Sequence, residues 1–244
     1  MSATWTPIAV ASEATRQRHR LWRAVEAQHL ISTRLLVDSA DEQALLERII
    51  EGVKPAAPTG AAARGLHYLL LTPWRYAPPP PGTRFRAPID EGVFYGADEI
   101  RTACAELGWW RWKFLQESPA LERIDWRQQT LFATAVFTAT VDLRRPPFDI
   151  DAADWAAPDS YVATQAFARV AREAGIGAIR YTSVRDPEPG GVCTAVLRLD
   201  AFSGAPDETA AQSWAIAVQR DRVIWRRQSP FVKEEFVFEM KAAA

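Results

Sequence analysis

The sequence predicts an α+β fold, in which helices are inserted among mainly antiparallel strands and a helical region precedes them. Two observations predict the strands. β-Branched and aromatic residues concentrate in the segment 131–143, and short alternating segments follow one another from residue 179 onward. A third observation predicts the helices, because apolar residues recur at helical spacing in segments that end at glycine or proline. The 244 residues suffice for one large domain, or for one domain with an appendage.

The first 60 residues are predicted to form a helical N-terminal region, and residues 61–244 the main domain. Residues 11–54 are expected to be helical, and the three arginines Arg16, Arg18 and Arg20 are expected on the polar face of the first helix. Ser39 and Glu42 have the spacing of a capping box ahead of a second helix that ends near Pro55. The stretch KPAAPTGAAAR (54–64) has the composition of a linker.

Short elements are expected next. The apolar run 66–72 is predicted to be a buried strand, and the four prolines of 78–81 exclude a helix. The segment GVFYG (92–96) is predicted to be a strand. A helix capped by Asp98 is then expected to run to about Gln116, with an apolar stripe directed to the core. That stripe consists of Ala103, Leu107, Trp110 and Phe114.

The second half of the chain alternates between both element types. The segment 131–143 is predicted to be a strand, and 160–174 a helix that Gly175 terminates. Two strands are expected at 179–184 and 192–199, joined by the turn DPEPGG. Three antiparallel strands are expected last, at 214–218, 223–227 and 231–238.

Composition and missing motifs exclude several classes of protein. Lys and Arg number 29 against 30 Asp and Glu, a balance that argues against a dedicated nucleic-acid binder. The arginine excess, 25 Arg against four Lys, is typical of bidentate anion contacts, but a coding bias gives the same skew. Two cysteines and three scattered histidines predict no metal site and no disulfide framework. No phosphate loop, GxGxxG turn or GxSxG elbow is present.

The sequence also contains no run of 18 apolar residues and no N-terminal signal pattern. We therefore expect a cytoplasmic protein without a membrane partner.

Candidate chemistry is concentrated between residues 73 and 116. Three arginines, an aromatic strand and one carboxylate occur there, and Glu106 is predicted at the flank of the apolar stripe of its helix. A carboxylate at such a position needs a partner or faces a cleft. The residues alone leave open whether Glu106 belongs to a structural Arg–Glu pair or to a site.

Ser183 is a second candidate, because alternation along its strand places it on one face with Ile179 and Tyr181. A small hydroxyl among bulky neighbours leaves room for a ligand, or it accepts a local hydrogen bond at the end of a strand.

These positions together resemble the RES-domain family, named for an Arg, a Glu and a Ser. The motifs occur in the family's order: Arg75-Tyr76, Gly82-Thr-Arg84-Phe, Tyr95, Glu106 and Tyr181-Thr-Ser183. Arg84 and Glu106 both lie 11 residues from Tyr95. The resemblance covers roughly residues 65–200. The chain departs from the family pattern at Arg86, and the sequence leaves open which group Arg86 contacts. It departs again at Cys193, where the family usually has an Asn- and Leu-rich strand.

The resemblance implies an ADP-ribosyltransferase-like fold with a split sheet, and an NAD+-consuming toxin of a toxin–antitoxin pair. NAD+ would be the substrate, with no metal required. Glu106, Arg84 and Tyr95 would be catalytic, and NAD+ would be bound by Arg75, Tyr76, Arg84, Tyr95 and Ser183. The implied partner is an Xre-type helix-turn-helix antitoxin.

The resemblance leaves the acceptor of ADP-ribose open among a protein, phosphate and water, and we favour a protein because the longer chain offers more docking surface. A different class of function is a non-catalytic partner-binding protein on the same fold, in which Glu106 forms a structural ion pair.

Overall fold

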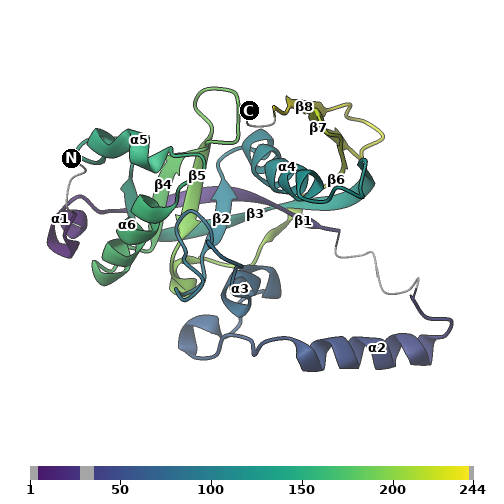
Figure 1. Cartoon of the computed structure of the whole chain (residues 1–244). Coiled ribbons are helices and arrows are strands. Elements are labelled where there is room, and N and C mark those ends of the chain that lie inside the picture. Colours follow the sequence, from purple (N-terminus) through teal and green to yellow (C-terminus); the bar gives the residue numbers. More distant parts are fainter. Residues whose placement is uncertain (1–4, 28–35, 242–244) are drawn as a thin grey trace.

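The computed structural model describes residues 5–27 and 36–241, and its centre is one eight-stranded sheet (Figure 1). The strand order is β1-β2-β5-β4-β3-β6-β7-β8, and β1 also pairs with β3. This second pairing closes β1, β2, β5, β4 and β3 into a ring, from which β6, β7 and β8 extend. All pairs are antiparallel except β3–β4. The predicted α+β class, with a mainly antiparallel sheet, is confirmed.

The strands span Thr15–Glu26 (β1), Phe94–Ala97 (β2), Ile124–Asp142 (β3), Ala178–Thr182 (β4), Val192–Val196 (β5), Asp207–Val218 (β6), Arg222–Arg227 (β7) and Glu235–Glu239 (β8). The α-helices span Pro7–Ser12 (α1), Ala40–Val53 (α2), Tyr68–Arg75 (α3), Ile100–Gln116 (α4), Ala152–Trp155 (α5) and Val162–Glu173 (α6). The predicted elements from residue 131 to the C-terminus therefore have the correct type, and Gly175 ends α6 with a φ of 73°.

The expectation that residues 11–54 are helical is wrong for β1. Residues 15–26 pair with β3 along their whole length, from Thr15 opposite Thr140 to Glu26 opposite Gln129. Arg16, Arg18 and Arg20 lie on the outer side of this strand and not on a helix; Arg16 stacks 4.9 Å from the ring of Phe137. Cross-strand pairing overrides the helix propensity of Arg, Gln and Leu here. Residues 1–4 and 28–35 of the predicted helical region lie outside the described residues.

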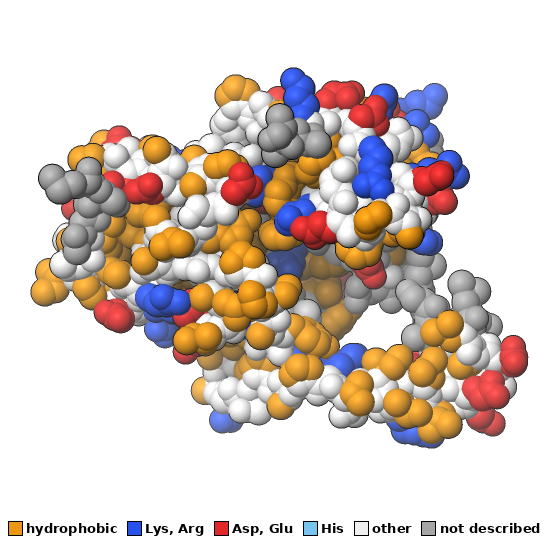
Figure 2. Space-filling model, viewed as in Figure 1, with side chains coloured by type: hydrophobic (Ala, Val, Ile, Leu, Met, Phe, Trp, Pro, Cys, Tyr) orange, Lys and Arg blue, Asp and Glu red, His pale blue; other side chains and the backbone are white. Residues whose placement is uncertain are grey.

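The second predicted helix is present as α2. The Ser39 hydroxyl accepts a hydrogen bond from the backbone N–H of Glu42, as the capping spacing predicts. α2 has no buried residue, and Figure 2 shows hydrophobic side chains on its surface, where it lies apart from the sheet.

The run 66–72 forms most of α3 and not a strand. The side chain of His67 accepts a hydrogen bond from the N–H of Leu69 and so begins the helix. Periodicity does not show whether a short, continuous apolar run forms a buried strand or a buried helix, because every residue of the run is apolar in either case.

The predicted apolar stripe of α4 is confirmed in part, because Ala103 is buried in the core and Leu107 packs against it, whereas Trp110 and Phe114 do not. Other residues of α4 face the core in their place. Its N-cap is Glu99, and the helix buries Cys104, Gly108, Trp112 and Leu115. Trp110 and Phe114 are 41% and 54% exposed, so the core-packing prediction is wrong for them. Gly108 explains the shift, because a Cβ there would lie only 3.0 Å from a methyl group of Val223 on β7.

No described helix is both long and apolar enough to cross a membrane.

Candidate functional site

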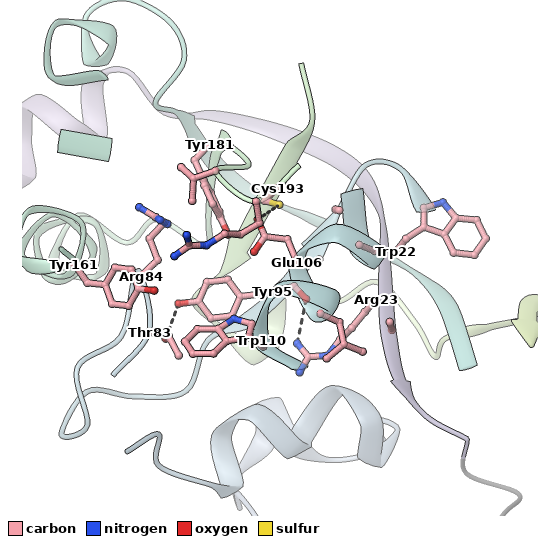
Figure 3. Close-up of a pocket in the computed structure, with 17 residues that line it drawn as sticks. Trp22, Arg23, Thr83, Arg84, Tyr95, Glu106, Trp110, Tyr161, Tyr181 and Cys193 are labelled. Carbon is pink, nitrogen blue, oxygen red and sulfur yellow. Dashed lines mark hydrogen bonds between the residues drawn. The ribbon is translucent and has the colours of Figure 1, made fainter. Parts of the chain in front are cut away.

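A pocket opens between α4, the ring of strands and the loop before β2 (Figure 3). Its polar and charged lining comprises Arg23, Thr83, Arg84, Tyr95, Glu106, Tyr161, Tyr181, Arg185 and Cys193. Leu107 and Trp110 of α4 supply part of the apolar wall. Two residues of the predicted stripe, Leu107 and Trp110, thus line this pocket beside Glu106.

Glu106 projects from α4 toward β5, and one oxygen of its carboxylate is held in place. Oε1 accepts a hydrogen bond of 2.6 Å from the hydroxyl of Ser183 and one of 3.5 Å from the thiol of Cys193. Burial and the charge of Glu106 raise the pKa of Cys193 well above its ordinary value, so the thiol keeps its proton. Both bonds go to Oε1, and the side chain of Glu106 lines the pocket.

Ser183 lies behind Glu106 and does not line the pocket. Its Oγ accepts hydrogen bonds from the backbone N–H groups of Arg185 and Asp186, at 3.2 and 3.1 Å. Because these donors occupy the lone pairs, the hydroxyl proton is directed to Glu106. Asp186 is itself fixed to α4, since it accepts a hydrogen bond from Thr102 and forms an ion pair with Arg101.

Tyr95 on β2 presents its ring to the pocket, while its hydroxyl is used for structure. The hydroxyl oxygen accepts a hydrogen bond from the N–H of Phe85 at 2.9 Å and lies 2.8 Å from Oγ1 of Thr83. Burial raises the pKa of Tyr95 to about 12, so the phenol stays neutral. The hydroxyl therefore fixes the loop that carries Arg84.

Arg84 reaches the pocket from this loop and is 7% exposed. Its Nη1 donates to the carbonyls of Trp155 and Ala157, and its guanidinium stacks 5.2 Å from the ring of Tyr161. Gln165 of α6 donates to the carbonyl of Thr83 and so holds the loop against the body.

The sequence analysis missed Arg23, a partly buried cation that lines the pocket together with Arg84 and Arg185. Arg23 projects from β1, and its Nη1 donates to the carbonyl of Tyr95 at 3.0 Å (Figure 3). Burial lowers its pKa to about 10, which leaves the group charged at neutral pH. The predicted helix over residues 15–26 gave no reason to place the side chain of Arg23 at the site. The alternation of the segment is the signal that would have placed Arg23 on a strand.

Arg75 and Tyr76 do not lie in this pocket. The guanidinium of Arg75 forms an ion pair of 2.8 Å with Glu51 on α2 and donates to the carbonyl of Pro55. The side chain of Tyr76 is exposed. The structure therefore does not bring the predicted Arg75-Tyr76 pair to the other candidates, because the helix α3 directs these residues toward α2.

Arg86 has a structural contact as well. Its Nη1 donates to the carbonyls of Pro73 and Tyr76, both at 2.8 Å. These bonds from Arg86 hold the end of α3 in place, so its role here is structural.

The site can stabilise positive charge at one point and bind negative charge at another. Glu106 offers one free carboxylate oxygen, and Arg23 and Arg84 offer guanidinium groups in a largely apolar enclosure, where charge interactions are strong. The described residues contain no cluster of three His, Cys, Asp or Glu side chains placed to hold a metal ion.

A comparison with protein-family models matches the RES domain to residues 58–219. The chain belongs to the RES-domain family. The matched region contains Arg84, Tyr95, Glu106 and Ser183 of this RES protein, whereas Arg23 precedes it.

None of the curated proteins matches the RES chain. Among solved structures, it is similar to a chain in the crystal structure of the M. tuberculosis MbcT–MbcA toxin–antitoxin complex. The identity is 14%, the alignment covers 80% of this chain and 82% of the other, and the TM-score is 0.45.

Proposed function

We propose that this protein is the toxin of a toxin–antitoxin pair, and that it cleaves the nicotinamide–ribose bond of NAD+ and transfers ADP-ribose to a protein. Membership of the RES family supports the choice of substrate. The observation that carries the proposal is the environment of Glu106, which lines the pocket beside Arg23 and Arg84 while its Oε1 is held by Ser183 and Cys193.

The bond that breaks joins C1′ of the ribose to the ring nitrogen of nicotinamide. Its electron pair leaves with the nicotinamide, which becomes neutral, and positive charge develops on the ribose as in glycoside cleavage. Oε2 of Glu106 stabilises this charge or accepts a hydrogen bond from a ribose hydroxyl. The nucleophile then bonds to C1′ and loses its proton, for which the carboxylate of Glu106 is the acceptor.

Binding is assigned to the groups around Glu106. Arg23 and Arg84 form charge-assisted hydrogen bonds with the pyrophosphate. The ring of Tyr95 stacks on the nicotinamide or its ribose, since its hydroxyl is occupied by Thr83 and Phe85. Arg23 takes the place that the sequence analysis gave to Arg75.

A protein acceptor is supported by two exposed aromatic side chains on α4, one of which lines the pocket. Trp110 lines the pocket and, like Phe114 one turn further along α4, is exposed to solvent. Such a surface suits contact with a macromolecule. Phosphate and water are the other acceptors that the same site would serve. The partner that neutralises the toxin is proposed to be an Xre-type helix-turn-helix antitoxin.

The test is release of nicotinamide from NAD+ by the purified protein, compared with Glu106→Gln. We expect the variant to lose activity by about 10²- to 10⁴-fold. Glu117→Gln, at an exposed position just beyond α4, is the matched control and should retain activity. Radiolabelled NAD+ with a cell lysate identifies the acceptor as labelled protein, ADP-ribose 1-phosphate or free ADP-ribose. A folded wild-type protein that releases no nicotinamide would overturn the proposal.

A further inference from the structure

Arg185 is a cation of the pocket to which neither the sequence motifs nor the proposed function gives a role. It follows β4 in the chain and lines the pocket together with Arg84 and Glu106. Its Nη2 donates to the carbonyl of Pro158 at 2.7 Å, and its guanidinium stacks on Trp109, 3.4 Å from the centroid of the ring. Its Nε and Nη1 form no hydrogen bond to the described residues, so these donors are available to a ligand.

Arg84 places a second guanidinium in the same part of the pocket. Its Nη1 donates to the carbonyls of Trp155 and Ala157, and Ala157 directly precedes Pro158, the partner of Arg185. The two guanidinium groups are therefore bound to one short segment of the chain. Nε and Nη2 of Arg84 also form no hydrogen bond within residues 5–27 and 36–241.

Neither guanidinium is balanced by a negative charge. In the part of the chain that the structure describes, no Asp or Glu forms an ion pair with Arg84 or Arg185, whereas Arg101 and Arg180 each have such a partner. Two like charges held close together at partly buried positions raise the free energy of the empty site. An anion that binds both groups would remove this repulsion, so the pair is typical of an anion site.

The turn that carries Arg185 is fixed on both sides of this residue. The N–H of Arg185 donates to Oγ of Ser183, and the carboxylate of Asp186 accepts a hydrogen bond from Thr102 of α4. Trp109, on which the guanidinium stacks, also belongs to α4. The side chain is thus held in place before a ligand binds, which lowers the entropic cost of binding.

The charges of the lining indicate the class of ligand. The pocket is lined by three arginines and by one carboxylate, that of Glu106, so positive charge is in excess by two. A pyrophosphate diester carries one negative charge on each phosphoryl group, and the planar fork of an arginine matches two phosphoryl oxygens. Two neighbouring guanidinium groups therefore fit two linked phosphoryl groups in number and in charge.

We propose that Arg185 is a further binding residue of this site, and that it holds the pyrophosphate of the substrate together with Arg84. The assignment of the pyrophosphate to NAD+ rests on the proposed function, whereas binding of the anion can be measured without any reaction.

The first experiment measures binding of inorganic pyrophosphate to the purified full-length protein by calorimetry. We expect Arg185→Gln to weaken binding about 10- to 100-fold, because a charge-assisted hydrogen bond is lost while the amide still offers a donor to Pro158. Arg145→Gln, at an exposed arginine outside the pocket, is the matched control and should bind like the wild type. A wild-type protein that does not bind inorganic pyrophosphate would overturn the proposal even if no variant folded, as would unchanged affinity in a folded Arg185→Gln protein.

The second experiment compares nicotinamide release from NAD+ and from nicotinamide riboside, which has the same scissile bond but no phosphoryl group. In phosphate-free buffer, Arg185→Gln should raise KM for NAD+ about 10- to 100-fold with little change in kcat, and should leave kcat/KM for the riboside within about twofold.

The outcomes separate this proposal from the proposed function. An equal loss of kcat/KM with both substrates would show that Arg185 only maintains the shape of the pocket, and it would overturn the anion site while the proposed function stands. A loss with NAD+ that appears only after phosphate is added would assign the pair to free phosphate and would also overturn the proposal. Binding of inorganic pyrophosphate through Arg185 without release of nicotinamide from NAD+ would support the anion site and refute the proposed function.

Discussion

The hydroxyl of Ser183 lies 2.6 Å from Oε1 of Glu106, although the two residues are 77 positions apart in the chain. Two backbone N–H groups that donate to the same hydroxyl fix the direction of its proton. We therefore propose that Ser183 acts through Glu106, as a positioning residue. The sequence analysis had given it a direct contact with NAD+.

Replacing Ser183 by Ala should lower kcat about 10- to 100-fold with little change in KM, because Glu106 loses its shortest hydrogen bond while the pocket lining is unchanged. Steady-state nicotinamide release measures both constants. Ser183→Thr keeps a hydroxyl and should restore part of kcat. Thr182→Ala, at the exposed neighbouring position, is the control. An increase in KM alone would show that Ser183 contacts the substrate.

Arg23 and Arg75 should differ sharply in their effects. Arg23→Ala is expected to raise KM for NAD+ about 10- to 100-fold, since it removes a charge-assisted hydrogen bond at a partly buried position. Arg75→Ala removes an ion pair with the exposed Glu51, so it should leave kcat/KM within about twofold and stability within about 1 kcal/mol. The opposite ranking of the two variants would restore Arg75 as the anion-binding residue.

Gly82 should tolerate no side chain. Its φ is 95°, and a Cβ there would lie 2.3 Å from the backbone oxygen of Arg86. Gly82→Ala is expected to lower the free energy of unfolding by about 1–3 kcal/mol and to reduce activity, because the turn carries Thr83 and Arg84. Gly52→Ala on α2 has open space and should be neutral or stabilise by up to about 1 kcal/mol. Urea unfolding compares the two, and equal midpoints would contradict the prediction.

His19 should make stability depend on pH. Burial and the positive charge of Arg180 lower its pKa from 6.5, and its Nδ1 lies 2.8 Å from Nη1 of Arg180. Below pH 6.5 the unfolded chain binds a proton at His19 that the folded chain does not, so stability should fall as the pH decreases from 6.5 toward the lowered pKa. Well above pH 6.5 the group contributes little pH dependence, because it is neutral in both states.

The measurement is urea unfolding between pH 7.5 and 5.5, a range above the ordinary titration of Asp and Glu, at about 4. His19→Asn keeps an acceptor for Arg180 and lacks the titration, so its stability should vary less with pH. An unchanged slope in this variant would show that another group is responsible.

The sequence by itself determined the elements whose local signals agree with one another. The helix α6 is amphipathic and ends at Gly175, where a left-handed conformation favours glycine, and Ser39 caps α2 through the predicted hydrogen bond. It also supplied the motifs that led to Arg84, Tyr95 and Glu106, which the structure places around one pocket.

Only the tertiary structure decided which other residues lie beside Arg84, Tyr95 and Glu106 in the pocket. Arg23 enters the pocket because β1 pairs with both β2 and β3, a long-range arrangement that outweighs the helix propensity of its own residues. Arg75 is excluded because α3 forms in place of a strand and directs it to Glu51. Local periodicity specifies which faces are apolar, whereas the partner that covers each face is set by contacts between distant segments.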